Sequence, residues 1–338
     1  MYNEQMIQEL RKRWNALQQA LAREGGDAIL ITTNVNLFYV SGRIFSGAAY
    51  VRPEGDPLFF VRRPVGLKGG NVIYIRKPEE IVGHLQQRGI PMPAKLFFET
   101  DSISYNEYRR YEKIFDPRVV CNGTQLLRGV RSIKTIYEIG RIMRSGVLHA
   151  RLYERIPSLY RPGMTDTELS IEIERESRRL GSLGIFRIFG QSMEIFMGSL
   201  LAGDNADAPS PYDFALGGAG LDASLPVGGN GTPLTDGTSV MVDMGGNFTG
   251  YMTDMTRVFS VGKLTDRAYK AHDTALEIQR RIEQTAAPGV PAADLYNLAV
   301  RIAADAGLSD YFMGHRQQAG FIGHGIGIEI NEAPVLAP

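Results

Sequence analysis

Cysteine and long apolar runs are scarce in this sequence, and their scarcity excludes several classes of protein. Cys121 is the sole cysteine among 338 residues, so neither a disulfide framework nor a cysteine-based zinc site can form within one chain. No apolar run approaches the roughly 18 residues that a membrane span needs, and the N-terminal MYNEQMIQEL is polar and lacks a signal-peptide core. We therefore expect a protein that does not enter a membrane and that resides in the cytoplasm.

An excess of charge of one sign is also missing. Lys+Arg and Asp+Glu both number 37, so the formal net charge is zero, and the basic excess expected of a general nucleic-acid binder is absent. What the sequence does contain is an ordinary globular composition, 43% hydrophobic and 22% charged. The length exceeds that of one simple domain and predicts two.

Strand-like and helical segments alternate over residues 1–128, which we expect to form an α/β domain. Apolar residues three and four positions apart predict a helix over 4–24, and Gly25-Gly26 ends it. The turn at Pro53–Asp56 predicts a hairpin. The remaining predicted elements are strands at 28–32, 73–76 and 95–99 and helices at 78–87 and 104–115.

Residues 129–338 have a different order: a helix pair, a glycine-rich strand region, and a second helix pair. Thr165 and Glu168 form a capping box, which predicts that a helix begins there. We expect His149 on a helix surface. The predicted helices cover 133–156, 165–180, 265–286 and 291–306, and the apolar residues of the first share one face at Ile136, Ile139, Met143, Gly146 and Ala150.

Two carboxylates interrupt the β-prone stretch 241–259. If its turn is centred on Phe248-Thr249, Asp243 and Asp254 face each other across a hairpin, with Cβ atoms about 5 Å apart. Carboxylates that close repel each other unless a cation lies between them, and a pair of divalent metals roughly 3.5–4 Å apart fits this spacing. The alternative is that both are turn or edge aspartates.

A histidine lies between glycines in FIGHGIGIEINEAP, residues 321–334. Glycines let the backbone approach a ligand closely, and neutral imidazole is the commonest nitrogen ligand of catalytic metals. His324 is therefore a candidate ligand, although a lone histidine near glycine is more often structural.

Together these segments resemble the metal-site motifs of the creatinase/prolidase/aminopeptidase P family, the pita-bread metallopeptidases. The resemblance covers nearly the whole chain. It implies an α/β creatinase-type N-terminal domain followed, over 129–338, by an α+β pita-bread (creatinase/methionine aminopeptidase-like) domain that is incomplete at its C-terminus. The matching segments are 242–245, 250–251, 254–257 and 323–327, with further agreement at 36–42, 131–134, 138–139, 162–165 and 288–289.

The resemblance also implies an activity. Its members hold two divalent ions, manganese, cobalt, zinc or iron, bridged by a hydroxide that attacks a peptide carbonyl. Asp243, Asp254 and His324 match three of the metal ligands. We thus expect a metal-dependent hydrolase of peptides, an Xaa-Pro aminopeptidase or dipeptidase, that forms a homodimer. By the same motif Arg257 braces the carboxylates; otherwise it is a surface cation.

The sequence departs from the family pattern at several positions. The family's two glutamate ligands lie well beyond the histidine motif, whereas Pro338 is 14 residues past His324, and Glu329 and Glu332 are too close to His324 to serve. We expect the chain to lack both. Asn331 replaces a second histidine and, as a catalytic candidate, can donate a hydrogen bond but cannot carry a proton. Ser210 stands about where another histidine would fall.

These departures keep two further functions open. One is a non-catalytic pita-bread protein that binds peptides or partners through the old cleft. The other is a creatinase-like hydrolase of a non-peptide C–N bond.

Overall fold

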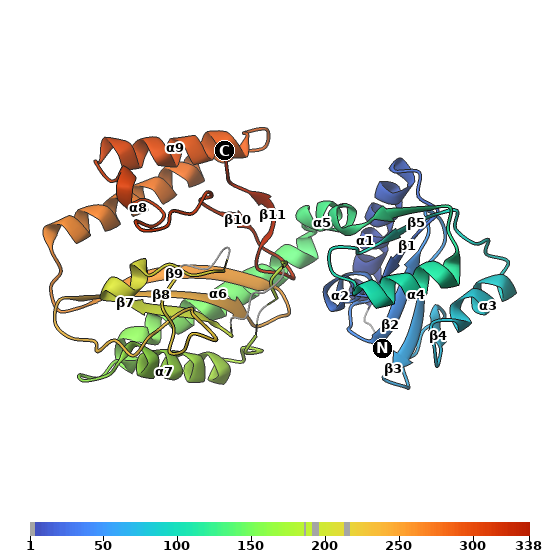
Figure 1. The fold of residues 1–338 in the computed structure, drawn as a ribbon, viewed down its shortest axis with the longest axis horizontal. Coiled ribbons are helices and arrows are strands. Elements are labelled where there is room, and N and C mark those ends of the chain that lie inside the picture. Colours follow the sequence, from blue (N-terminus) through green and yellow to red (C-terminus); the bar gives the residue numbers. More distant parts are fainter. Residues whose placement is uncertain (1–3, 186, 191–195, 213–216) are drawn as a thin grey trace. The chain divides into compact units, whose positions relative to one another are not determined.

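The chain forms two compact units in the computed structural model, Met1–Tyr137 and Glu138–Pro338 (Figure 1). The structure describes residues 4–185, 187–190, 196–212 and 217–338. In those ranges no helix is both long and apolar enough to cross a membrane.

The first unit is a six-stranded mixed sheet with strand order β4-β3-β2-β1-β5-β6. β2 lies antiparallel to both β1 and β3, whereas β5 pairs parallel with β1 and β6. The hairpin predicted around Pro53–Asp56 is confirmed as β2–β3. The strands are β1 (Ala28–Ile31), β2 (Ser46–Val51), β3 (Leu58–Arg63), β4 (Val72–Tyr74), β5 (Lys95–Phe98) and β6 (Val119–Asn122).

Helices cover both faces of this sheet, which explains why β1 is apolar and buried along its whole length. Alternate strand residues, among them Leu30, Tyr50 and Phe60, form a core with α3 and α4. The residues between them face α1, whose Leu21 lies close to Phe97. The helices are α1 (Glu4–Arg23), α2 (Asn34–Ser41), α3 (Glu80–Gln87), α4 (Tyr105–Phe115) and α5 (Thr124–Ser132).

Helix α2 was not predicted from the sequence, because it is only eight residues long and apolar on most sides. Its ends are nevertheless well defined. Thr33 accepts a hydrogen bond from the Asn36 backbone, and Gly42 adopts φ 70 at the C-cap. Short helices of this kind are set by their caps and surroundings.

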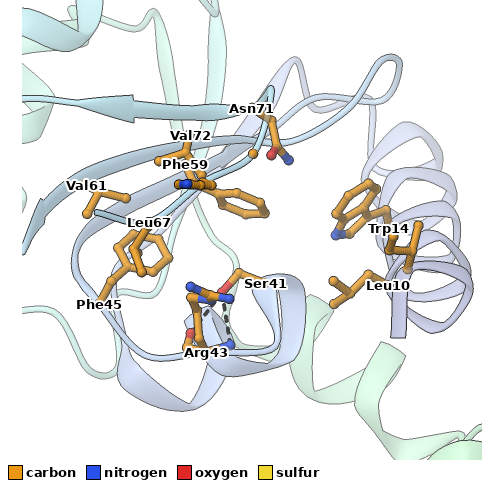
Figure 2. A pocket seen from close by; sticks show the side chains of 13 residues that line it. Leu10, Trp14, Ser41, Arg43, Phe45, Phe59, Val61, Leu67, Asn71 and Val72 are labelled. Carbon is orange, nitrogen blue, oxygen red and sulfur yellow. Dashed lines mark hydrogen bonds between the residues drawn. The ribbon is translucent and has the colours of Figure 1, made fainter. Parts of the chain in front are cut away.

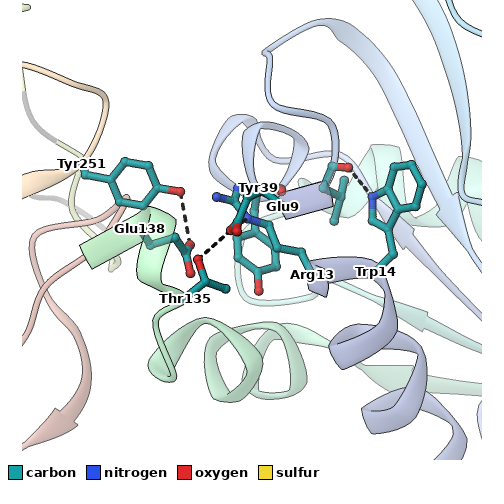
Figure 3. Close-up of polar contacts among 8 residues, drawn as sticks. Glu9, Arg13, Trp14, Tyr39, Thr135, Glu138 and Tyr251 are labelled. Atoms are coloured by element: carbon teal, nitrogen blue, oxygen red, sulfur yellow. Dashed lines mark hydrogen bonds and ion pairs between the residues drawn. The ribbon is translucent and has the colours of Figure 1, made fainter. Parts of the chain in front are cut away.

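Buried polar contacts tie α1 to its neighbours within the first unit (Figure 3). Arg13 Nε donates to Glu9 Oε1 at 2.7 Å, and Arg13 Nη1 donates to the Tyr39 carbonyl at 3.0 Å. Thr135 Oγ1 donates to the same Glu9 oxygen at 2.8 Å. A buried charge needs such partners, so these contacts hold α1 in one orientation.

The second unit contains a three-stranded antiparallel sheet, β7-β8-β9. α6 and α7 cover one side of it, and the β10–β11 ribbon and the α8–α9 pair lie on the other (Figure 1). The elements are α6 (Ile136–Leu159), α7 (Asp166–Arg179), β7 (Gly198–Ala202), β8 (Thr238–Asn247), β9 (Met252–Val261), α8 (Asp266–Thr285), α9 (Ala292–Asp305), β10 (His324–Gly325) and β11 (Glu332–Val335).

The capping box predicted at Thr165 is confirmed in both directions. Thr165 Oγ1 accepts from the Glu168 backbone at 3.2 Å, and Glu168 Oε2 accepts from the Thr165 backbone at 2.8 Å. These two bonds fix the start of α7.

Candidate metal centre

The β8–β9 hairpin brings the two predicted aspartates to one face of the sheet, with a register that differs from the predicted one. Asp243 lies opposite Thr256, and Asp254 lies opposite Gly245. The expectation that the two aspartates face each other directly is therefore wrong by two residues. The turn is centred on Thr249-Gly250 rather than Phe248-Thr249. A two-residue shift keeps the face, so the aspartates are diagonal neighbours.

Local hydrogen bonding explains the position of this turn. Gly250 has φ 84, a conformation that glycine adopts without steric cost. Its N–H donates to Asn247 Oδ1 at 3.1 Å. An asparagine side chain that accepts from the backbone three residues later stabilises a turn at that point.

Asp243 is held in a position that disfavours its charge. Burial first, and then the neighbouring Asp254 carboxylate, raise the pKa of Asp243 well above its usual value. Thr256 Oγ1 donates to Asp243 Oδ1 at 2.5 Å and opposes that rise in part. A cation beside the carboxylate would remove the cost of ionising it.

His324 reaches the same site from the β10–β11 ribbon. Its Nδ1 lies 3.0 Å from the Gly325 carbonyl oxygen, and its Nε2 lies 3.4 Å from Asp254 Oδ2. A carbonyl oxygen only accepts, so Nδ1 carries a proton and the neutral ring presents the Nε2 lone pair to Asp254. Two acceptors this close need a proton or a metal ion between them.

The protonated form of His324 is favoured by its neighbours. Burial alone would lower the pKa of His324, but the hydrogen bond to Asp254, the bond to Gly325 and the two carboxylate charges raise it overall. Gly325 lets β10 and β11 pack closely, because an added Cβ there would lie 2.4 Å from the Ala333 carbonyl oxygen. The close pairing of β10 with β11, which positions His324, therefore requires glycine at this position.

The donor chemistry fits a divalent cation. Asp243 and Asp254 offer carboxylate oxygens, and His324 offers a ring nitrogen. Asp254 and His324 are already in contact, while Asp243 stands beside them on the same face. Over the described ranges, however, no three His, Cys, Asp or Glu side chains converge in a metal-binding arrangement.

The other two predicted site residues lie elsewhere. Arg257 pairs opposite Val242, on the sheet face away from the aspartates, and its guanidinium donates to the Thr256 carbonyl at 2.7 Å. Asn331 is buried, and its amide exchanges two 2.7 Å hydrogen bonds with the backbone of Phe189. The structure thus does not bring either side chain to the candidate ligands.

The side chain of Glu332 contacts the residues just before it in the chain. Its carboxylate accepts from the Glu329 backbone at 3.1 Å and lies against Gly327, where an added Cβ would come within 2.4 Å. This arrangement closes the turn between His324 and β11.

The glycine-rich loop 217–231 lies beside the same sheet, held by two buried residues that the sequence did not single out. Asp166 accepts hydrogen bonds from the Asn230 and Gly231 backbones at 3.0 and 2.8 Å. Asn205 donates to the Gly228 carbonyl at 2.9 Å. Gly228 packs near Ser199, which pairs with Asp243 across β7–β8.

His149 occupies the interior of the sheet–helix core. The expectation of a helix-surface position is wrong, because its exposed fraction is 0%. Its Nδ1 lies 3.0 Å from Thr253 Oγ1, and its ring meets Tyr153 edge-on at 5.1 Å. Burial lowers the pKa of His149 to about 4, against a smaller opposing effect of Asp254.

Acid is therefore expected to destabilise the protein through His149. The folded-state pKa of about 4 lies below the ordinary value of 6.5, so the unfolded chain takes up the proton first as pH falls. The free energy of unfolding should drop by about 3 kcal/mol between pH 6.5 and 4 from this group. Urea unfolding of His149→Gln across that range should show a shallower decline than the wild type.

The exposed His272 on α8 gives the matched control. His272→Gln should retain the wild-type decline. An unchanged pH slope in His149→Gln would contradict the prediction.

Comparison with known proteins places this geometry in a family. The model for metallopeptidase family M24 matches residues 140–338, and that for the creatinase/prolidase N-terminal domain matches 13–133. The chain belongs to metallopeptidase family M24. The expected fold class is thereby confirmed: a creatinase N-terminal domain and an M24 pita-bread domain.

Curated relatives of this M24 chain share about a quarter of its residues. An uncharacterized peptidase of Staphylococcus haemolyticus is 26% identical over 332 residues, covering 94% of this chain and 83% of the relative. The uncharacterized peptidase YqhT of Bacillus subtilis is 25% identical over 335 residues, covering 95% and 84%.

Solved structures share the fold of the M24 chain. An Xaa-Pro dipeptidase from Bacillus anthracis superposes with TM-score 0.76 at 23% identity, covering 97% of this chain and 85% of that one. An X-Pro aminopeptidase from Thermotoga maritima gives 0.75 at 20% identity, covering 94% and 85%.

Proposed function

We propose that this M24 protein is a metal-dependent peptidase that cleaves peptides with proline in the second position, as an Xaa-Pro aminopeptidase or dipeptidase. The observation that carries the proposal is the gathering of Asp243, Asp254 and His324 on one face of the M24 domain. The fold shared with an Xaa-Pro dipeptidase and an X-Pro aminopeptidase supports the substrate class. A cytoplasmic location and a homodimer belong to the same proposal.

In this proposal Asp243, Asp254 and His324 bind divalent ions, with manganese, cobalt, zinc or iron as candidates. Such ions would polarise a scissile carbonyl and would lower the pKa of a bound water molecule toward neutrality. Asn331 acts through structure, since its amide fixes the backbone at Phe189. The catalytic role expected of Arg257 stays a prediction.

Metal analysis and peptide cleavage test the proposal together. The purified protein should contain or take up manganese or cobalt, and it should hydrolyse Ala-Pro or Ala-Pro-Ala faster than Ala-Ala or Ala-Ala-Ala. Removal of the metal by a chelator should abolish cleavage, and added manganese or cobalt should restore it. Mass spectrometry of metal content and chromatography of the released amino acids provide the readouts.

Two results would overturn it. Absence of both metal uptake and peptide cleavage would favour a non-catalytic binding protein. Cleavage of creatine but of no Xaa-Pro peptide would favour a creatinase-like C–N hydrolase.

A further inference from the structure

A cavity of about 210 Å³ lies within the first unit, remote in sequence from the candidate ligands. It is lined by α1, the end of α2 and the segment after it, strand β3 and the segment that leads into β4. Figure 2 shows Leu10 and Trp14 on one side of the hollow and Phe45 on the other. No step of the proposed peptidase activity uses this cavity.

Most of the cavity lining is apolar, and part of it is aromatic. The rings of Trp14 and Phe45 each lie next to Phe59, with centroids 6.3 and 6.1 Å from it. The indole Nε1 of Trp14 donates to the Val40 carbonyl at 2.6 Å, away from any ligand. Ser41 donates its hydroxyl to the Leu37 carbonyl at 2.7 Å. A molecule in contact with this lining therefore meets ring faces and methyl groups.

The charged side chains among the described lining residues carry one sign. They are Arg43, which is partly buried, and Lys68, which is exposed on the segment before β4. An apolar cavity with two cations among its lining residues matches a ligand that has an apolar body and one anionic end.

We propose that this cavity binds a small apolar carboxylate, whose hydrocarbon part lies against Trp14, Phe45 and Phe59 and whose carboxylate faces Arg43 and Lys68. The volume limits the size of the ligand. Apolar cavities of about 150 Å³ in other proteins take up benzene, so this one accommodates a phenyl ring or a branched chain of similar size.

The chain supplies its own probe, because Trp14 is its single tryptophan and stands in the cavity wall. Titration of the full-length protein with 3-phenylpropionate should change the tryptophan emission saturably. Its neutral amide, 3-phenylpropionamide, should bind about tenfold more weakly, since a charge-assisted bond is lost. Acetate, which has the charge without the apolar body, should give no saturable change.

Variants separate the two halves of the site. Arg43→Gln should reduce the preference for the acid over the amide about tenfold, whereas Arg11→Gln, on the exposed side of α1, should leave it unchanged. Val72→Phe, which fills the cavity, should abolish binding of both compounds. Calorimetry measures the same affinities independently of tryptophan fluorescence, and thermal unfolding checks that each variant is folded.

Three outcomes would overturn the proposal: no saturable response to 3-phenylpropionate, equal affinities for acid and amide, or undiminished binding in Val72→Phe. None of them depends on peptidase activity. Failure here and failure of the proposed function are therefore distinguishable.

Discussion

Asp243→Asn is expected to abolish divalent-metal binding and lower peptidase activity by about three orders of magnitude, while stabilising the metal-free protein. The first effect follows because a neutral amide is a much weaker ligand for a hard cation than a carboxylate. The second follows from the position of Asp243. The side chain is partly buried and is a diagonal neighbour of Asp254 across the hairpin, so its negative charge is costly without a cation.

The stabilising effect follows from the raised pKa of Asp243. The pKa of Asp243 in the folded protein is raised above 3.8, so at neutral pH the unfolded chain carries this negative charge more easily than the folded one. Stability from this group is full in acid and is lost as pH rises toward the folded-state pKa. Removing the charge should add about 2 kcal/mol to the unfolding free energy of the metal-free protein at pH 8.

Urea unfolding in chelator and metal titration by calorimetry measure the two effects separately. Asp273→Asn, at an exposed position on α8, is the control and should change neither. If Asp243→Asn retained the metal, or lost stability in its absence, Asp243 would not be the strained ligand described above.

Sequence alone located the candidate ligands, but it did not give their pairing. Asp243 and Asp254 are recognisable because carboxylates are rare within β-prone runs. Their register depends on where the chain turns. The hydrogen bond from the Gly250 backbone to Asn247 stabilises a turn one residue later than the predicted position. Each such step shifts the opposing residue by two, so the shared face was predictable and the facing partner was not.

Helix α6 shows a second limit. Its apolar residues share one face, yet Ile136 is 86% and Met143 65% exposed. The buried face carries Leu152, Tyr153 and Ile156 together with the polar Ser145 and His149. The partners of these two polar residues, Thr249 and Thr253, come from the β8–β9 hairpin about a hundred residues later. Polar side chains are buried in a core when they have hydrogen-bond partners there. The spacing of apolar residues along a helix does not reveal partners that are distant in the sequence.

Comparing Asp166 with Asp266 measures how much the contacts of Asp166 with the glycine-rich loop contribute to stability. Each is the first residue of its helix and follows a threonine N-cap, Thr165 in α7 and Thr265 in α8. An acidic residue in the first turn contributes roughly 0.3–1 kcal/mol through the helix dipole. Because this contribution is common to both positions, any excess at Asp166 comes from its other contacts.

Those contacts are extensive. Asp166 is fully buried and accepts from the Thr167 backbone at 2.6 Å in addition to its two bonds with the loop. Gly229 fits closely over the carboxylate, since an added Cβ would lie 3.1 Å from it. The loop backbone is therefore held in one position against the Asp166 carboxylate, which accepts its hydrogen bonds.

Asp166→Ala is expected to lower the unfolding free energy by about 4 kcal/mol, because it leaves buried backbone N–H groups without acceptors. Asp266→Ala, at an exposed position, should cost about 0.5 kcal/mol. Urea unfolding measures both, and hydrogen exchange at residues 228–231 should quicken only in Asp166→Ala. Equal losses in the two variants would show that the dipole contribution dominates and that the loop is held from elsewhere. With the loop lying near Ser199, opposite Asp243, its release should also lower peptidase activity in Asp166→Ala and leave that of Asp266→Ala unchanged.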